Sequence, residues 1–100
     1  MATENNLKTK NEVDIAPPSL WKVVFLNDDV TPMDIVIEIL VKVFKHDDRT
    51  AKEITMEVHN TGSGIAGAYI YEIAEQKGLE ATAIARSNGY PLRIQVEEES

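Results

Sequence analysis

Residues 27–33, NDDVTPM, join a run with the composition of a strand to a run with the composition of a helix. The first run, WKVVFL at 21–26, is rich in β-branched and aromatic residues and has the length of a strand. The second run is almost wholly apolar, and Thr31 followed by Pro32 fits the N-cap and the first position of a helix. We therefore predict that a strand ends and a helix begins around the three polar side chains of residues 27–29.

The polar side chains of Asn27, Asp28 and Asp29 have two interpretations. Asn and Asp favour turns and helix caps because their side chains bond the local backbone, so the three could do no more than shape this connection. They could also bind a ligand, since they place acceptor oxygens directly ahead of a helix. Both interpretations are compatible with the spacing.

The chain contains 100 residues and no cysteine. This length, with an apolar fraction of 43%, is sufficient for one small domain with a single core. The absence of cysteine excludes a disulfide framework, a thiolate metal site and a cysteine nucleophile. Residues 1–14 contain no apolar signal segment, and no apolar run is long enough to span a bilayer, so we expect a cytoplasmic protein.

Acidic residues outnumber basic ones by 17 to 10, which gives a net charge of −7. Nucleic-acid phosphates and anionic lipids repel such a chain, and no stripe of lysine and arginine alternates with aromatic residues. We expect neither nucleic acid nor a membrane as a partner. The surplus of acids could complement a positively charged ligand, or it could serve solubility alone.

The predicted order of elements is β-α-α-β-α-β. Residues 1–17 are polar and predict a disordered tail, followed by one folded domain at 18–98. The helices are expected at 32–45, from Asp47 or Asp48 to 60, and at 75–87, and the strands at 21–26, 65–74 and 92–96. Three strands with the helices on one face predict an α+β two-layer sandwich, in which three helices pack on a three-stranded antiparallel sheet.

The first helix carries its polar residues on one narrow stripe, formed by Asp34, Glu38, Lys42 and Lys45. A helix that is apolar elsewhere must be covered on most sides, so we place it between the sheet and a second helix. The spacing of a buried face recurs in the second helix at Ala51, Ile54, Thr55 and Val58. The core candidates of the third helix are Leu79, Ala83 and Ile84.

One group of side chains could carry chemistry, and it consists of Asn27, Asp28 and His59. The link between the first two helices is short, so the last turn of the second helix can return beside the start of the first, which brings His59 near Asn27 and Asp28. An α-ammonium group has three donors and a positive charge, and an amide oxygen, a carboxylate and a neutral imidazole nitrogen offer three acceptors. The side chains that could line a pocket for one apolar group beside them are Met33, Val36, Thr55, Val58 and Leu92.

Simpler roles exist for each of these residues. The helix dipole favours a charged histidine at a helix C-terminus, which would explain His59 without a ligand. Met33 and Val36 could belong to the core, and His46, in a polar link, is expected to be solvated. The four serines lie outside any nucleophile context and the two histidines lack zinc-site spacing, so we predict no enzymatic activity, no metal and no cofactor.

Short motifs that together form a recognisable pattern are spread over the whole predicted domain, from about residue 17 to residue 96. They are Lys22-Val23-Val24, Leu26-Asn27-Asp28-Asp29, Thr31-Pro32-Met33, Val58-His59, Gly67, Glu72-Ile73-Ala74-Glu75, Lys77 and Pro91-Leu92. This pattern resembles the ClpS family, the adaptors that select N-degron substrates for the Clp AAA+ protease. The resemblance implies that Asn27, Asp28 and His59 bind the free N-terminal amine of a substrate protein. It also implies a pocket for a large apolar first side chain, Leu, Phe, Tyr or Trp, formed by Asp29, Thr31, Met33, Val36, Thr55, Val58 and Leu92.

The resemblance implies a partner as well. Glu72 and Lys77 match positions that contact the N-terminal domain of a Clp unfoldase of the ClpA or ClpC type, and the tail matches a segment that engages the unfoldase during substrate transfer. The sequence departs from the family pattern at two positions. Thr55 stands where methionine is more common, which predicts a different first-residue preference, and Val30 replaces an aromatic residue beside the pocket.

Two other functions remain possible from the residues. A protein–protein interaction module that does not recognise N-termini could bind a basic loop through the acidic residues 27–29. A hydrolase could use Asp28 and His59 as an orienting group and a base. The three functions differ in whether a short peptide binds, whether its free amine matters, and whether an ester is turned over.

Overall fold

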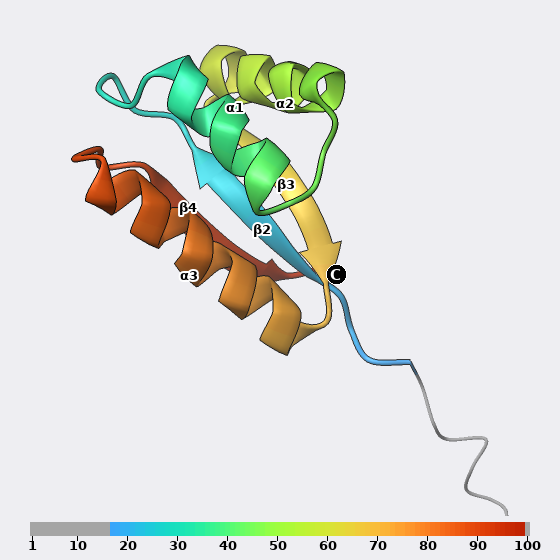
Figure 1. Ribbon diagram of the computed structural model, residues 1–100. Coiled ribbons are helices and arrows are strands. Elements are labelled where there is room, and N and C mark those ends of the chain that lie inside the picture. The colour runs from blue at the N-terminus through green and yellow to red at the C-terminus, as the bar shows by residue number, and fades with distance from the viewer. Residues whose placement is uncertain (1–16, 100) are drawn as a thin grey trace, which may run out of the picture.

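A three-stranded antiparallel sheet with strand order β3-β2-β4 forms one layer of the fold (Figure 1). The computed structural model describes residues 17–99, so the predicted disordered tail lies almost wholly outside the described residues. The elements are β2 (Trp21–Leu26), α1 (Met33–Lys42), α2 (Asp48–Thr61), β3 (Ser63–Tyr69), α3 (Tyr71–Ser87) and β4 (Arg93–Glu98). Strand β2 pairs antiparallel with both neighbours, which confirms the predicted order and the α+β class.

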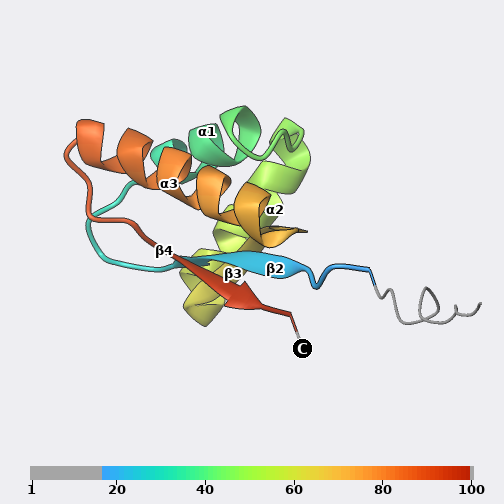
Figure 2. The same cartoon turned by 90° about the horizontal axis from the view of Figure 1, so that it is seen from below.

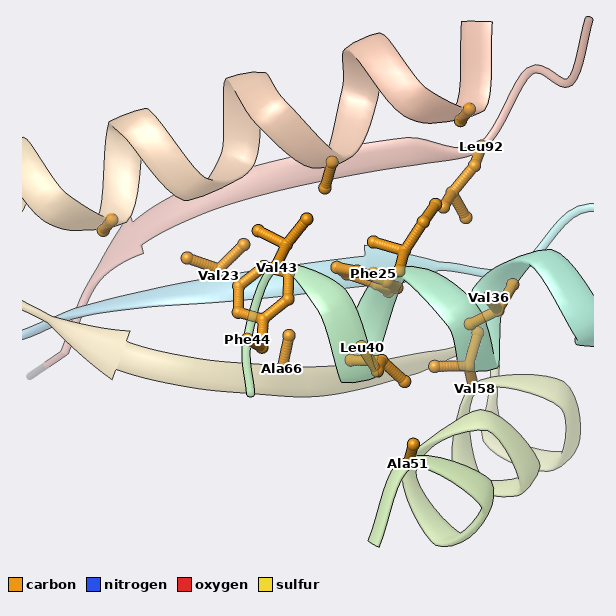
Figure 3. Close-up of a cluster of buried hydrophobic side chains, with 14 residues drawn as sticks. Val23, Phe25, Val36, Leu40, Val43, Phe44, Ala51, Val58, Ala66 and Leu92 are labelled. Carbon is orange, nitrogen blue, oxygen red and sulfur yellow. The ribbon is translucent and has the colours of Figure 1, made fainter. Parts of the chain in front are cut away.

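The helices form the second layer. Seen from below, α1 and α3 lie on the same face of the sheet, and α2 lies beside α1 on the β3 side (Figure 2). Val23 and Phe25 point from β2 into the space between the layers, where they meet Leu40 and Phe44 from the first helix and its C-terminal turn (Figure 3). The apolar α1 is therefore covered by the sheet below it and by α2 at its side, as its sequence predicts.

The first helix begins one residue later than predicted. Pro32, not Thr31, is the N-cap, and its carbonyl accepts hydrogen bonds from the N–H groups of Ile35 and Val36 at 3.2 and 3.4 Å. The helix also ends earlier, at Lys42, and Lys45 beyond it adopts a positive φ of 63° that no continued helix allows. The Thr31 hydroxyl does not cap the helix, because it donates a hydrogen bond to the Asp28 carboxylate.

The ends of α2 follow the sequence closely. Asp47 is the N-cap, and its carboxylate accepts a hydrogen bond from Thr50 N–H at 2.8 Å. Gly62 ends the helix in the left-handed region with φ 97°, where a Cβ atom would be strained. This tight end turns the chain directly into β3.

The prediction of a strand over 65–74 was wrong beyond Tyr69, because α3 already begins at Tyr71. The β-branched and aromatic residues Ile70, Tyr71 and Ile73 suggested a strand, but all three are exposed. What decides the helix is a buried stripe at helical spacing, formed by Ala74, Gly78, Ala81 and Ala85. Side chains this small let α3 lie close to the sheet, and a Cβ on Gly78 would be 3.3 Å from Val96 Cγ2.

Three further expectations are corrected by the same packing. Leu79 and Ala83 are exposed on α3 and do not belong to the core, while Ile84 is half-buried. Strand β4 begins at Arg93, after Leu92, which is 1% exposed and lies in the core. His46 is half-buried and not simply solvated, because its Nε2 atom is hydrogen-bonded to the carbonyl of Ala66 at 2.5 Å and ties the α1–α2 connection to β3.

Candidate functional site

A backbone hydrogen bond joins the end of β2 to the end of α2. The N–H of Asn27 donates to the carbonyl of Gly62 at 2.9 Å. This bond holds the segment 27–31 against the last turn of α2, the turn that carries His59. Asn27 and Gly62 are 35 positions apart in the sequence and meet here because Gly62 ends α2 sharply at the level where β2 also ends.

A cavity of about 290 Å³ opens at this junction. Its walls come from the connection between β2 and α1, from the first turn of α1 and from the second half of α2. The residues that line it are Asn27, Asp28, Asp29, Thr31, Met33, Val36, Thr55, Val58 and His59. All nine were predicted as site residues from the sequence. The tenth, Leu92, is not among the lining residues, and its carbonyl accepts a hydrogen bond from Arg86 Nη1 at 2.7 Å.

The floor of the cavity is apolar and its rim is polar. Val36 and Val58 are 5% and 3% exposed and lie next to each other between α1 and α2 (Figure 3). Thr55 is equally buried, and its hydroxyl donates to the carbonyl of Ala51 at 2.8 Å, so its polar group is satisfied within α2. Around the rim, the side chains of Asn27, Asp29, His59 and the larger Met33 are exposed.

Hydrogen bonds fix the Asp28 carboxylate at the rim. Oδ1 accepts from the N–H groups of Val30 and Thr31, both at 2.7 Å, and Oδ2 accepts from the Thr31 hydroxyl at 2.9 Å. Local backbone bonds were one of the two interpretations of this aspartate from the sequence, but the sequence did not indicate that the threonine three residues later would donate twice. The sequence does contain a pattern that could have indicated this contact. Asp47 and Thr50 have the same spacing as Asp28 and Thr31, and at the start of α2 the Asp47 side chain accepts from the Thr50 N–H.

Burial alone would raise the pKa of the Asp28 carboxyl. The two backbone N–H groups, the Thr31 hydroxyl and the positive charge of Arg86 outweigh it, and they hold this pKa below its ordinary value. Asp28 is therefore a fixed negative charge at neutral pH. The cavity combines one charged acceptor with an amide, an imidazole and an apolar floor, an arrangement suited to a cationic group attached to an apolar side chain.

Within residues 17–99, no group of three or more histidine, aspartate or glutamate side chains is arranged to hold a metal ion. In the same part of the chain, no helix combines the length and the hydropathy needed to cross a membrane.

The two residues expected to contact an unfoldase lie on α3, away from the cavity. Glu72 is exposed in the first turn of the helix. Lys77 is half-buried, and its ammonium donates to the carbonyl of Val43 at 2.8 Å. Val30, the second departure from the expected pattern, is 61% exposed and does not line the cavity.

Comparison with known proteins assigns a family. The family model for the ATP-dependent Clp protease adaptor protein ClpS matches residues 16–95. The ClpS adapter of Deinococcus radiodurans is 40% identical over 97 residues, which cover 97% of this chain and 86% of the relative. The ClpS adapter of Shewanella pealeana is 44% identical over 98 residues and 96% of each chain.

A solved structure agrees with these relatives. Agrobacterium tumefaciens ClpS2 bound to L-phenylalaninamide superposes with a TM-score of 0.80 at 37% identity, over 83% of this chain and 100% of that one. Its fold confirms the arrangement of three strands and three helices described above. From the match over most of its length, we conclude that this chain belongs to the ClpS family of Clp protease adaptor proteins.

Proposed function

We propose that this protein is an adaptor that binds the free N-terminal amine and the large apolar first side chain of substrate proteins and delivers them to a Clp AAA+ unfoldase. The observation that carries the proposal is the cavity itself. Its rim brings together the acceptors of Asn27, Asp28 and His59, and its floor is formed by the buried side chains of Val36 and Val58.

The rim suits an α-ammonium group in charge and in number of donors. The ammonium has three N–H donors, and Asn27, Asp28 and His59 can each accept one of them. Only Asp28 supplies a full negative charge, and a hydrogen bond between two charged groups is about twice as strong as a neutral one. Acetylation of the amine removes the charge and leaves a single donor, so an acetylated or internal residue is bound weakly.

The floor suits an apolar side chain. Burying one large apolar side chain contributes on the order of 1.5–3 kcal/mol. The related ClpS2 was solved with L-phenylalaninamide, a molecule with a free amine next to a phenylalanine side chain, which is the combination that this cavity would accept. We propose Leu, Phe, Tyr and Trp as first residues.

Delivery requires a second surface. We propose that α3 contacts the N-terminal domain of an unfoldase of the ClpA or ClpC type through Glu72 and Lys77. Glu72 is exposed and on a separate element from the cavity, so both partners could be bound together. No catalytic role is proposed for any residue.

Fluorescence anisotropy with short labelled peptides tests the amine recognition. The peptides differ in their first residue, Leu, Phe, Tyr, Trp, Val or Gly, and each is made with a free and an acetylated amine. We expect only free-amine peptides with a large apolar first residue to bind. Asp28→Ala should abolish this binding, while Asp48→Ala, which removes an exposed acid at the other end of α2, should preserve it. Equal binding of acetylated peptides would favour a module that does not recognise N-termini.

A further inference from the structure

The Asp28 carboxylate has little acceptor capacity left. A carboxylate offers about four lone-pair positions, two on each oxygen. The N–H groups of Val30 and Thr31 occupy both positions on Oδ1, and the Thr31 hydroxyl occupies one on Oδ2. One position therefore remains on Oδ2 of this side chain, which lines the cavity.

We propose that Thr31 is a positioning residue, whose hydroxyl orients Asp28 so that the one free lone pair of Oδ2 receives a proton of the substrate ammonium. This inference rests on the proposed recognition of a free amine and assigns its geometry. Asp28 then accepts a single ammonium proton, and the other two are accepted by Asn27 and His59. Thr31 contributes to binding through Asp28 and not through its own contact with the ammonium.

The hydroxyl can do this because it is the only donor on Oδ2 among the described residues. The two backbone N–H groups hold Oδ1 and would persist without the hydroxyl, but Oδ2 would lose its fixed direction. Thr31 is half-buried and also lines the cavity, so it could serve only as part of the wall. The two roles are separable because valine keeps nearly the shape of threonine and removes the hydroxyl.

The chain contains a matched control for loss of such a hydroxyl. Asp47 and Thr50 have the same spacing as Asp28 and Thr31, and Asp47 Oδ1 likewise accepts from the N–H of the threonine, at 2.8 Å. This pair lies at the start of α2, at the opposite end of the helix from His59, and does not line the cavity. The Thr50 side chain also helps to hold the pKa of the Asp47 carboxyl below its ordinary value, so Thr50→Val affects a capping aspartate and leaves the cavity unchanged.

The experiment measures the affinity of a phenylalanine-first peptide and of its des-amino counterpart, in which hydrogen replaces the amine. We expect Thr31→Val to weaken binding of the free-amine peptide about 10- to 150-fold, the range for loss of one hydrogen bond to a charged group, and to leave the des-amino peptide unchanged. Thr31→Ser, which retains the hydroxyl, should recover most of the loss. Thr50→Val should change neither affinity, and Thr31→Val should have no further effect in the Asp28→Asn background.

A role in the wall alone predicts different results. Thr31→Val would then weaken both peptides equally, or Thr31→Ser would fail to recover the loss, and either result overturns the proposal. If the wild-type protein does not prefer the free amine, the proposed function fails. The contact between the Thr31 hydroxyl and Asp28 is then tested separately, by comparing the NMR titration of the Asp28 carboxyl in the wild type and in Thr31→Val. Asp29 and His59, which line the same cavity, and Arg86, whose charge acts on this carboxyl, are unchanged in Thr31→Val, so an Asp28 pKa that does not rise in the variant excludes the contact.

Discussion

The side-chain ammonium of Lys77 donates a hydrogen bond to the backbone carbonyl of Val43 at 2.8 Å. The two residues are 34 positions apart, and the bond fastens the middle of α3 to the C-terminal end of α1. The ammonium also lies 5.4 Å from the ring centroid of Tyr69 and 6.0 Å from that of Phe44. A helix C-terminus and aromatic rings both attract a positive charge, so this lysine is held by three favourable contacts.

Lys77→Met should lower the free energy of unfolding by about 1–3 kcal/mol, because a charged hydrogen bond is lost and a carbonyl near the core is left without this partner. Urea denaturation followed by circular dichroism measures the change. Lys52→Met is the control, since Lys52 forms only an exposed ion pair with Asp48 and should change stability by less than about 0.5 kcal/mol. Equal stability of both variants would show that the Lys77 bond contributes nothing.

Gly64→Ala should destabilise the fold by about 1–3 kcal/mol and also weaken peptide binding. A Cβ atom at this position would lie 2.8 Å from Cγ2 of Val58, a side chain of the cavity floor, and would displace it. Gly62→Ala is the comparison, because nothing lies within 4 Å of a Cβ there and its cost arises from the positive φ. Thermal unfolding should show that both variants lose stability. Anisotropy, measured at a temperature at which both variants are folded, should show that only Gly64→Ala loses peptide affinity.

His59→Ala should weaken the binding of free-amine peptides, because it removes one of the three proposed acceptors of the ammonium. His59→Gln keeps an acceptor at this position and should retain more of the affinity. Asp28 should keep its charge throughout the neutral and mildly acidic range, because its lowered pKa means that the charge is fully present above the ordinary carboxyl value of about 3.9 and disappears only as the pH falls through the lower folded value. Anisotropy titrations with the free-amine peptide measure both variants.

His46→Ala is the control for loss of an imidazole. The protein has two histidines, and His46 is hydrogen-bonded to Ala66 outside the cavity. This variant should keep the peptide affinity of the wild type. If instead His46→Ala loses affinity and His59→Ala does not, the assignment of the acceptor to His59 is wrong.

Thr55→Met should reduce the affinity for peptides that begin with Trp or Phe several-fold more than for peptides that begin with Leu, since a longer side chain fills part of the cavity floor. Thr55→Val should change peptide affinity little, because the Thr55 hydroxyl bonds Ala51 within α2 and not the cavity. Anisotropy titrations of the three peptides against both variants measure this ranking. A large loss in Thr55→Val would mean that the hydroxyl contacts the ligand directly.

Local patterns in the sequence were sufficient to predict most of the elements. The β-branched and aromatic composition of Trp21–Leu26 and the capping aspartate at 47 each act within a few residues of their position, so they could be interpreted without the fold. The acceptors around Asn27 and the residues of the cavity were also predicted, because donor counting and the ClpS-like spacing agreed.

What could not be predicted depends on contacts between distant segments. The start of α3 at Tyr71 contradicts the β propensity of its first residues, and it is decided by a stripe of alanines and Gly78 that fits against β4. The exposure of Leu79 and the burial of Leu92 follow from the same packing. The strand propensity of a residue is a local preference, whereas the burial of apolar side chains depends on how several segments pack together. Where the two disagree, as at the start of α3, the packing determines the structure.

The sequence by itself determined the class of the fold, the order of its elements and the residue types that we propose as acceptors of an amine. Only the tertiary structure decided how these residues meet. The bond from Asn27 N–H to the Gly62 carbonyl brings the two halves of the site together, and the three bonds to Asp28 leave one acceptor position free. Hydrogen-bond directions depend on ångström-scale placement of atoms from separate elements, and a sequence specifies that placement only through the packing of the whole core.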